Sequence, residues 1–376
     1  MTQEVLRTEV PLGPNGLWGS RNLSTMPLTG LIQANNVDYY GGVLSKEGGA
    51  LQYTTGSPFF GNVSTIVGGY DWWPDAVHQE PVALQAAGAY YRDAGNGLYG
   101  TALVASGIVT SNVSPVFVEG GKEVAANNRK LFMFTGKNTV KVVSGVSAGA
   151  ATALALPPAD WAGANQPSFG FTYQNRLWGG GNPNDPHRIY YSVQGSHEDF
   201  TGAGSGSISI YAGVGEKLIA GFEFKGYIFL FKYPRGIFVI DASAADITTW
   251  SVQTQSKSIG LCGSNAWCHI DDDVVFMDTS GQIQILSRID QFTYSARSLS
   301  DQQQMRDFIT TNVDQSRLWD ARAVYYAFKR EVQFAVTAPG GAAYNNRRLV
   351  IDLNALPDQT SLVSSTLHPR FRFSDR

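Results

Sequence analysis

The stretch YIFLFKYPRGIFVID, residues 227–241, indicates most directly how this chain folds. Two apolar, aromatic-rich runs flank a short Pro-Arg-Gly segment, and proline and glycine favour a tight turn between paired strands. The stretch therefore predicts a β-hairpin. Because both runs are almost continuously apolar, we expect both faces of this hairpin to be buried.

The same unit recurs along the chain as an aromatic-rich strand, a glycine-containing or polar turn, and a second strand. Copies begin at residues 88, 130, 175, 227, 273 and 323. A hairpin alone has too little apolar surface to be stable, so such units must pack against one another. A period of roughly 40 to 50 residues made of β units is typical of the blades of a β-propeller.

The sequence thus predicts an all-β fold, a β-propeller of six blades. A weaker copy at 39–54 would add a seventh blade. We expect an N-terminal extension at 1–38, the propeller at 39–355 and a C-terminal segment at 356–376, with both terminal segments irregular. Helical signal is confined to 299–313, where Ser300 is a candidate N-cap for a short surface helix.

The composition agrees with this fold and excludes several classes of protein. The 376 residues include 41 glycines, 12% aromatic and only 16% charged residues, which favours turns and strands over solvated helices. The net charge of −3 gives no global basic field for nucleic acid. The start resembles no signal peptide, and no apolar run reaches the roughly 20 residues of a membrane helix. We expect a soluble protein without membrane insertion.

The stretch NRLWGGGNPNDPHRIYYSVQGSHEDF, residues 175–200, contains side chains that could serve as acids, bases or metal ligands. However, its two histidines bracket one strand, and GGGNPNDP is typical of turns. We therefore interpret the polar residues as exposed loop residues that contact other subunits. These candidate interface residues are Asn184, Asp185, His187, Arg188, His197, Glu198 and Asp199.

No other pattern predicts catalysis or a cofactor. The aspartates of IDDDVVF, 270–276, lack the spacing, glycine and glutamate of an EF-hand loop. Cys262 and Cys268 have no second pair with which to form a zinc site, so we expect two thiols in preference to a disulfide. The glycine runs at 179–182 and 202–207 lack the form of phosphate-binding loops. We predict a protein that is not an enzyme, with no catalytic, cofactor-binding or metal-binding residues.

Several blocks together resemble one family of bacteriophage proteins. They are LSKEGGALQY (44–53), GGYDWWPD (68–75), the segment 166–201, the segment 218–241 and AVYYAFKREVQFAV (323–336). The segment 166–201 contains a phrase of the form N-R-L-W, G, N-P, R-I-Y-Y-S, D-F. In this phrase the chain is similar to the tail nozzle, or packaged-DNA stabilisation, proteins of short-tailed phages. The resemblance spans roughly residues 40 to 355.

The resemblance implies a structural virion protein located in the phage tail and assembled in the host cytoplasm. It implies a β-propeller subunit of a homo-oligomeric ring, a hexamer in the family, around the channel through which genomic DNA is ejected. Adaptor or portal proteins and distal tail proteins would be the neighbours. The family offers no catalytic residues. Because the chain is short for this group, its place as nozzle, hub or decoration stays open.

A second hypothesis is a carbohydrate-binding or carbohydrate-active propeller. Trp72, Trp73 and Trp178 could then stack on sugar rings. Tryptophans in such hairpins more often pack between blades, which favours the first hypothesis. A cluster of carboxylates and arginines at one face of the propeller would favour the second.

Overall fold

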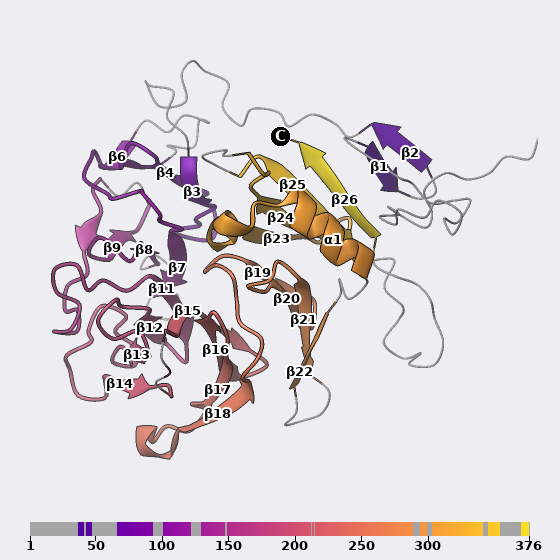
Figure 1. Ribbon diagram of the computed structural model, residues 1–376. Helices are drawn as coiled ribbons and strands as arrows, with labels where there is room; N and C mark the ends of the chain where they lie inside the picture. The colour runs from indigo at the N-terminus through magenta and orange to yellow at the C-terminus, as the bar shows by residue number, and fades with distance from the viewer. Residues whose placement is uncertain are drawn as a thin grey trace, which may run out of the picture. The chain divides into compact units, whose positions relative to one another are not determined.

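The fold is all-β, a β-propeller of six four-stranded antiparallel sheets (Figure 1). The computed structural model describes residues 37–40, 43–46, 66–92, 101–121, 129–146, 149–211, 213, 215–288, 294–298, 303–340, 345–353 and 370–375. The chain divides into two compact units. The larger unit is residues 51–265, and the second unit combines 1–50 with 266–376.

The larger unit contains four of the sheets, and in each sheet the strands pair in chain order. The first sheet is β3 (Ile66–Tyr70), β4 (Val82–Gln85), β5 (Tyr90–Arg92) and β6 (Thr101–Val104). The second is β7 (Val116–Gly120), β8 (Lys130–Phe134), β9 (Lys141–Ser144) and β10 (Thr152–Ala153). The third is β11 (Phe169–Tyr173), β12 (Arg176–Gly180), β13 (Arg188–Tyr191) and β14 (Gly206–Ser209). The fourth is β15 (Lys217–Phe224), β16 (Tyr227–Tyr233), β17 (Ile237–Asp241) and β18 (Ser251–Ser256), with the short helix η2 (Ile247–Thr249) before β18.

The second unit contains two four-stranded sheets and a hairpin. One sheet is β19 (Trp267–Ile270), β20 (Asp273–Met277), β21 (Ile283–Arg288) and β22 (Tyr294–Ser298). The other is β23 (Arg322–Tyr326), β24 (Glu331–Val336), β25 (Arg347–Asp352) and β26 (Arg370–Asp375). Helices α1 (Gln303–Asn312) and η3 (Gln315–Asp320) lie between them in the chain. The hairpin is β1 (Val37–Tyr40) with β2 (Val43–Lys46).

The six predicted hairpin copies are confirmed, one in each four-stranded sheet. The copies at 130, 175, 227 and 273 are the second and third strands of their sheets. The copy at 88 supplies the third and fourth strands, and the copy at 323 supplies the first and second. The sequence period therefore identifies the sheets correctly without always marking the same strands within them.

Two expectations at the ends of the chain need adjustment, and a third is confirmed. The weak copy at 39–54 forms no blade in the described residues, because β1 and β2 pair only as a two-stranded sheet. Strand β26 pairs with β25, so the expected boundary at residue 355 does not coincide with the end of the last sheet. The helix expected at 299–313 is present as α1, whereas its candidate cap Ser300 and residues 1–36 lie outside the described residues.

The first strands of the second, third and fourth sheets lie side by side. Strand β11 contacts both β7 and β15, as can be followed in Figure 1. The close approach depends on glycine. A Cβ on Gly170 of β11 would lie 2.4 Å from the ring of Phe134, and a Cβ on Gly221 of β15 would lie 2.5 Å from the ring of Phe171. Each ring thus occupies space that a side chain on the next sheet would fill.

Trp178 lies at the centre of one buried cluster in the larger unit. Its side chain is fully buried and is stacked against Phe171, with ring centroids 5.9 Å apart. Trp250 and Tyr191 pack against it at 5.5 and 4.9 Å. Within the described residues, no helix has both the length and the apolar composition of a membrane span.

We expect Trp178→Ala to lower the free energy of unfolding by about 3 to 5 kcal/mol, because it removes a buried ring and leaves a cavity. Urea denaturation followed by far-UV circular dichroism measures this change. Trp73→Ala is the matched control, since Trp73 is 39% exposed. Equal losses in the two variants would contradict the packing described for Trp178.

Candidate functional site

A small charged network lies at the surface where the loop between β12 and β13 leads into β13 and meets Asp160. Arg188 Nη1 lies 3.2 Å from Asp160 Oδ2 and 3.9 Å from Asp185 Oδ1. Tyr190 donates its hydroxyl proton to the same Asp160 oxygen at 2.7 Å. The side chains of Arg188 and Asp160 are 41% and 44% exposed, so both charges remain accessible to another molecule.

Hydrogen bonds to the buried Asn165 hold the backbone of this loop in place. Asn165 Oδ1 accepts the backbone N–H of Asn184 at 2.8 Å. The buried Asn182 donates through Nδ2 to the Asn165 carbonyl at 3.2 Å. Asn184 itself is exposed. The loop is thus a rigid platform that carries exposed polar groups.

His187 belongs to a different environment from its neighbour Arg188. Its Nδ1 is buried and has no hydrogen-bond partner. Burial lowers the pKa of His187, and the nearby ammonium of Lys232 lowers it further. Lys232 is itself fully buried, donates to the Tyr211 carbonyl and lies 3.5 Å from Glu216.

The segment His197–Asp199 supports the fold locally. His197 is only 7% exposed, and a Cβ on Gly120 of β7 would lie 2.9 Å from its ring. Glu198 forms an ion pair with Lys130 of β8. Asp199 Oδ1 accepts the backbone N–H groups of residues 201 and 202, each at 2.9 Å. The side chains of these three residues therefore make contacts within the larger unit. They do not form a second exposed loop like the one around Arg188.

The structure places the other predicted residues as follows. Both cysteines are thiols outside any disulfide, and burial raises the pKa of the Cys268 thiol to about 12. Trp72 and Trp178 are fully buried, which leaves only Trp73 of the three candidate sugar platforms at the surface. In the described part of the chain, no group of three or more His, Cys, Asp or Glu side chains could hold a metal ion.

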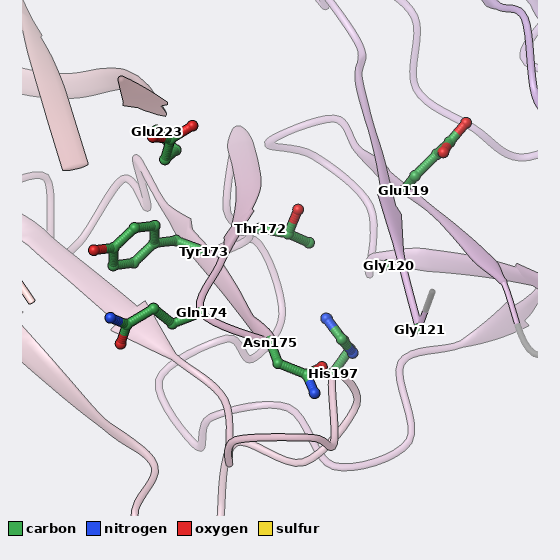
Figure 2. Close-up of a pocket in the computed structure, with 9 residues that line it drawn as sticks. All are labelled: Glu119, Gly120, Gly121, Thr172, Tyr173, Gln174, Asn175, His197 and Glu223. Carbon is green, nitrogen blue, oxygen red and sulfur yellow. The ribbon is translucent and has the colours of Figure 1, made fainter. Parts of the chain in front are cut away.

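A pocket that the sequence analysis did not find lies where β7, β11 and β15 end (Figure 2). Its volume is about 390 Å³. The lining residues are Glu119, Gly120, Gly121, Thr172, Tyr173, Gln174, Asn175, His197 and Glu223. Thus one end of three neighbouring first strands, the β11–β12 turn and His197 together line this pocket.

Local backbone geometry positions the pocket wall. Gln174 and Asn175 form the two-residue turn between β11 and β12, both with left-handed backbone, φ +46° and +55°. Tyr173 donates its hydroxyl proton to the Gly226 carbonyl at 2.7 Å, and Glu223 Oε1 accepts the Gly226 N–H at 2.7 Å. The turn after β15 therefore holds Tyr173 and Glu223 in place.

A signal for this pocket was available in the repeat itself. Thr172 pairs with Leu177 and Glu223 pairs with Ile228, each one step before the pair that closes its hairpin. Polar residues at matching positions in otherwise apolar first strands would predict a shared location at one end of the sheets. Aligning the copies on their turns, and not on their aromatic runs, would have revealed this correspondence.

No protein-family model matches the sequence, and no curated protein matches it. Solved structures match in fold. A proposed 6-phosphogluconolactonase from Bacteroides uniformis is 9% identical, with a TM-score of 0.45 and 79% of each chain covered. BBS1N in complex with ARL6DN is 8% identical, with a TM-score of 0.44, covering 73% of this chain and 78% of that one. BamB from Moraxella catarrhalis is 13% identical, with a TM-score of 0.37, covering 74% and 78%. At these values the similarity concerns the fold alone.

We expect protein stability to fall as the pH drops below about 6.5, in part because of His197. Burial and the neighbouring Lys130 lower the pKa of His197 in the folded state. The unfolded chain therefore binds a proton at a higher pH than the folded chain does, and acid favours unfolding. His197→Gln should flatten the dependence of the free energy of unfolding on pH by up to about 1.4 kcal/mol per pH unit.

Urea denaturation at a series of pH values between about 5 and 8 measures this slope. Above about pH 7.5 the curves for His197→Gln and the wild type should run parallel, since histidine no longer titrates there. Identical slopes below pH 6.5 would contradict the burial of a neutral His197.

Proposed function

We propose that this chain is a structural subunit of the tail of a short-tailed phage, a propeller that forms a homo-oligomeric ring around the genome exit channel. The observation that carries the proposal is the phrase at 175–200, in which the chain resembles the tail nozzle proteins. A hexamer is the state that the resemblance favours. Its neighbours would be an adaptor or portal protein on one side and distal tail proteins on the other.

The role of the phrase in the structure supports the proposal. Arg176 donates through Nη1 to the carbonyls of Ser192 and Gly204, both at 2.7 Å. Trp178 fills the buried cluster, and Phe200 packs against Trp161 at 4.9 Å. The polar and aromatic members of the phrase thus hold one blade together. The resemblance to the nozzle proteins therefore concerns residues that hold this blade together.

The charged loop between β12 and β13 is the candidate contact with a neighbouring subunit. Arg188, Asp160 and Asp185 carry both signs of charge on a fixed backbone, which suits a specific polar interface. Identical subunits that contact one another head to tail close into a ring when the rotation permits. The net charge of −3 suits a channel that DNA crosses without being retained, because few phosphates would be neutralised.

The carbohydrate-binding hypothesis has less support. Two of its three candidate tryptophans, Trp72 and Trp178, are fully buried. The pocket contains two glutamates, but its described lining includes no arginine. We therefore prefer the tail subunit.

We expect the full chain to form a closed homo-oligomer in native mass spectrometry and light scattering, and to join purified short tails. Arg188→Glu should weaken this assembly about tenfold or more, because it reverses an exposed charge next to two carboxylates. The thermal midpoint of the subunit should change little. Lys257→Glu reverses an exposed charge elsewhere in the larger unit and should leave assembly intact.

A strict monomer that also fails to join tails would overturn the proposal. If Arg188→Glu assembled as well as Lys257→Glu, the ring would have to use another surface. Electron microscopy of the intact particle would then locate the chain directly.

A further inference from the structure

The residue just before Arg188 is a titratable group that the proposed function does not use. His187 is half-buried, and its Nδ1 is buried without a hydrogen-bond partner. The carbonyl of His187 accepts the backbone N–H of Ile210 at 2.8 Å. The carbonyl of Pro186 accepts that of Leu218 at 2.7 Å. These two bonds hold the end of the β12–β13 loop against the end of β14 and the start of β15.

The charged groups that act on His187 are Lys232 and Glu216. Lys232 of β16 is fully buried, and its Nζ lies 3.5 Å from Glu216 Oε2. Arg235, in the turn after β16, lies with its Nε 3.5 Å from the other oxygen of the same carboxylate. Two cations therefore share one carboxylate, and a charge on His187 would add a third.

The other charged side chains on these elements do not compensate this excess. Lys217 of β15 lies 5.8 Å from the centre of the Tyr233 ring. In the loop itself, Asp185 and Arg188 lie 3.9 Å apart and contribute one charge of each sign. Among the described residues, none accepts a hydrogen bond from His187 Nδ1.

The protonation state of His187 changes what its buried nitrogen needs. Neutral imidazole can carry its proton on Nε2, which leaves Nδ1 as a buried lone pair. Protonated imidazole places a charged N–H at Nδ1, without an acceptor and close to the ammonium group of Lys232. A buried charged donor without a partner costs more free energy than a neutral acceptor does. Burial and Lys232 accordingly lower the pKa of His187.

We propose that protonation of His187 releases this end of the β12–β13 loop, so that the loop is docked at neutral pH and detached in mild acid. A histidine in the detached loop titrates near its ordinary pKa of about 6.5, whereas in the docked loop it titrates at lower pH. Docking is therefore weakened as the pH falls below about 6.5. Because Arg188 follows His187, the same step moves the charged network at Asp160. The inference concerns the isolated chain and does not depend on the role in the phage tail.

Amide hydrogen exchange of the full chain, resolved to single residues, tests the proposal. The N–H groups of Ile210 and Leu218 are the reporters, because their acceptors are the last two carbonyls of the loop. Their protection factors, corrected for the intrinsic exchange rate at each pH, should fall several-fold from about pH 7.5 to 5.5. The limit for one proton is about tenfold per pH unit. The N–H of Ser192, bonded to the Leu177 carbonyl in the same sheet, should lose much less protection.

Three variants identify the group that titrates. His187→Gln cannot gain a charge, so the protection of Ile210 and Leu218 should lose most of its dependence on pH. His197→Gln makes the same change at another histidine with a lowered pKa and should retain the fall. Lys232→Met removes the neighbouring charge and should reduce the fall.

Constant protection of both amides in the wild type, or an equal fall in the wild type and in His187→Gln, would overturn the proposal. If His187→Gln lacked protection at every pH, Lys232→Met would decide the matter. An undiminished fall in that variant would then show that the charge beside His187 has no part in docking.

Discussion

Aromatic rings that rest on glycine backbones hold the neighbouring sheets of the larger unit together. The ring of Phe134 lies where Gly170 would carry a Cβ, and the ring of Phe171 lies where Gly221 would carry one. Those Cβ atoms would lie 2.4 and 2.5 Å from the rings, so neither position has room for even a methyl group. Because glycine permits this approach, the first strands come close enough for their polar ends to enclose one cavity. The pocket is therefore a consequence of packing that occurs in the apolar interior.

Local sequence was sufficient for the hairpins because each one is encoded by two adjacent apolar runs and a turn. It was insufficient for the last sheet. Strand β26 is RFRFSD, and its partner β25 lies some way back in the chain. The same reason explains the weak copy at 39–54. A hairpin pattern in the sequence predicts two strands joined by a turn, as in β1 and β2. It does not predict whether two further strands pair with them.

The candidate site shows the same division between local and distant determinants. Turn residues predicted the exposed loop that carries Arg188, because asparagine, aspartate and proline act on their own backbone. His197 and Glu198 look equally polar in sequence, but their surroundings come from the preceding sheet, through Gly120 and Lys130. Glu119 and Glu223 are about a hundred residues apart in the numbering, and only the placement of three strands brings them to one cavity.

The turn at Gln174 and Asn175 places two amide side chains at this cavity. Left-handed backbone is easiest for glycine, and asparagine accepts it better than glutamine does. The corresponding turn of the next sheet uses Lys225 and Gly226, whereas this turn keeps two amide side chains. Backbone strain that persists in a folded protein tends to gather where side chains are needed for binding. A glycine at position 174 would relax the turn and remove part of the pocket wall, so stability and recognition make opposite demands on that single residue.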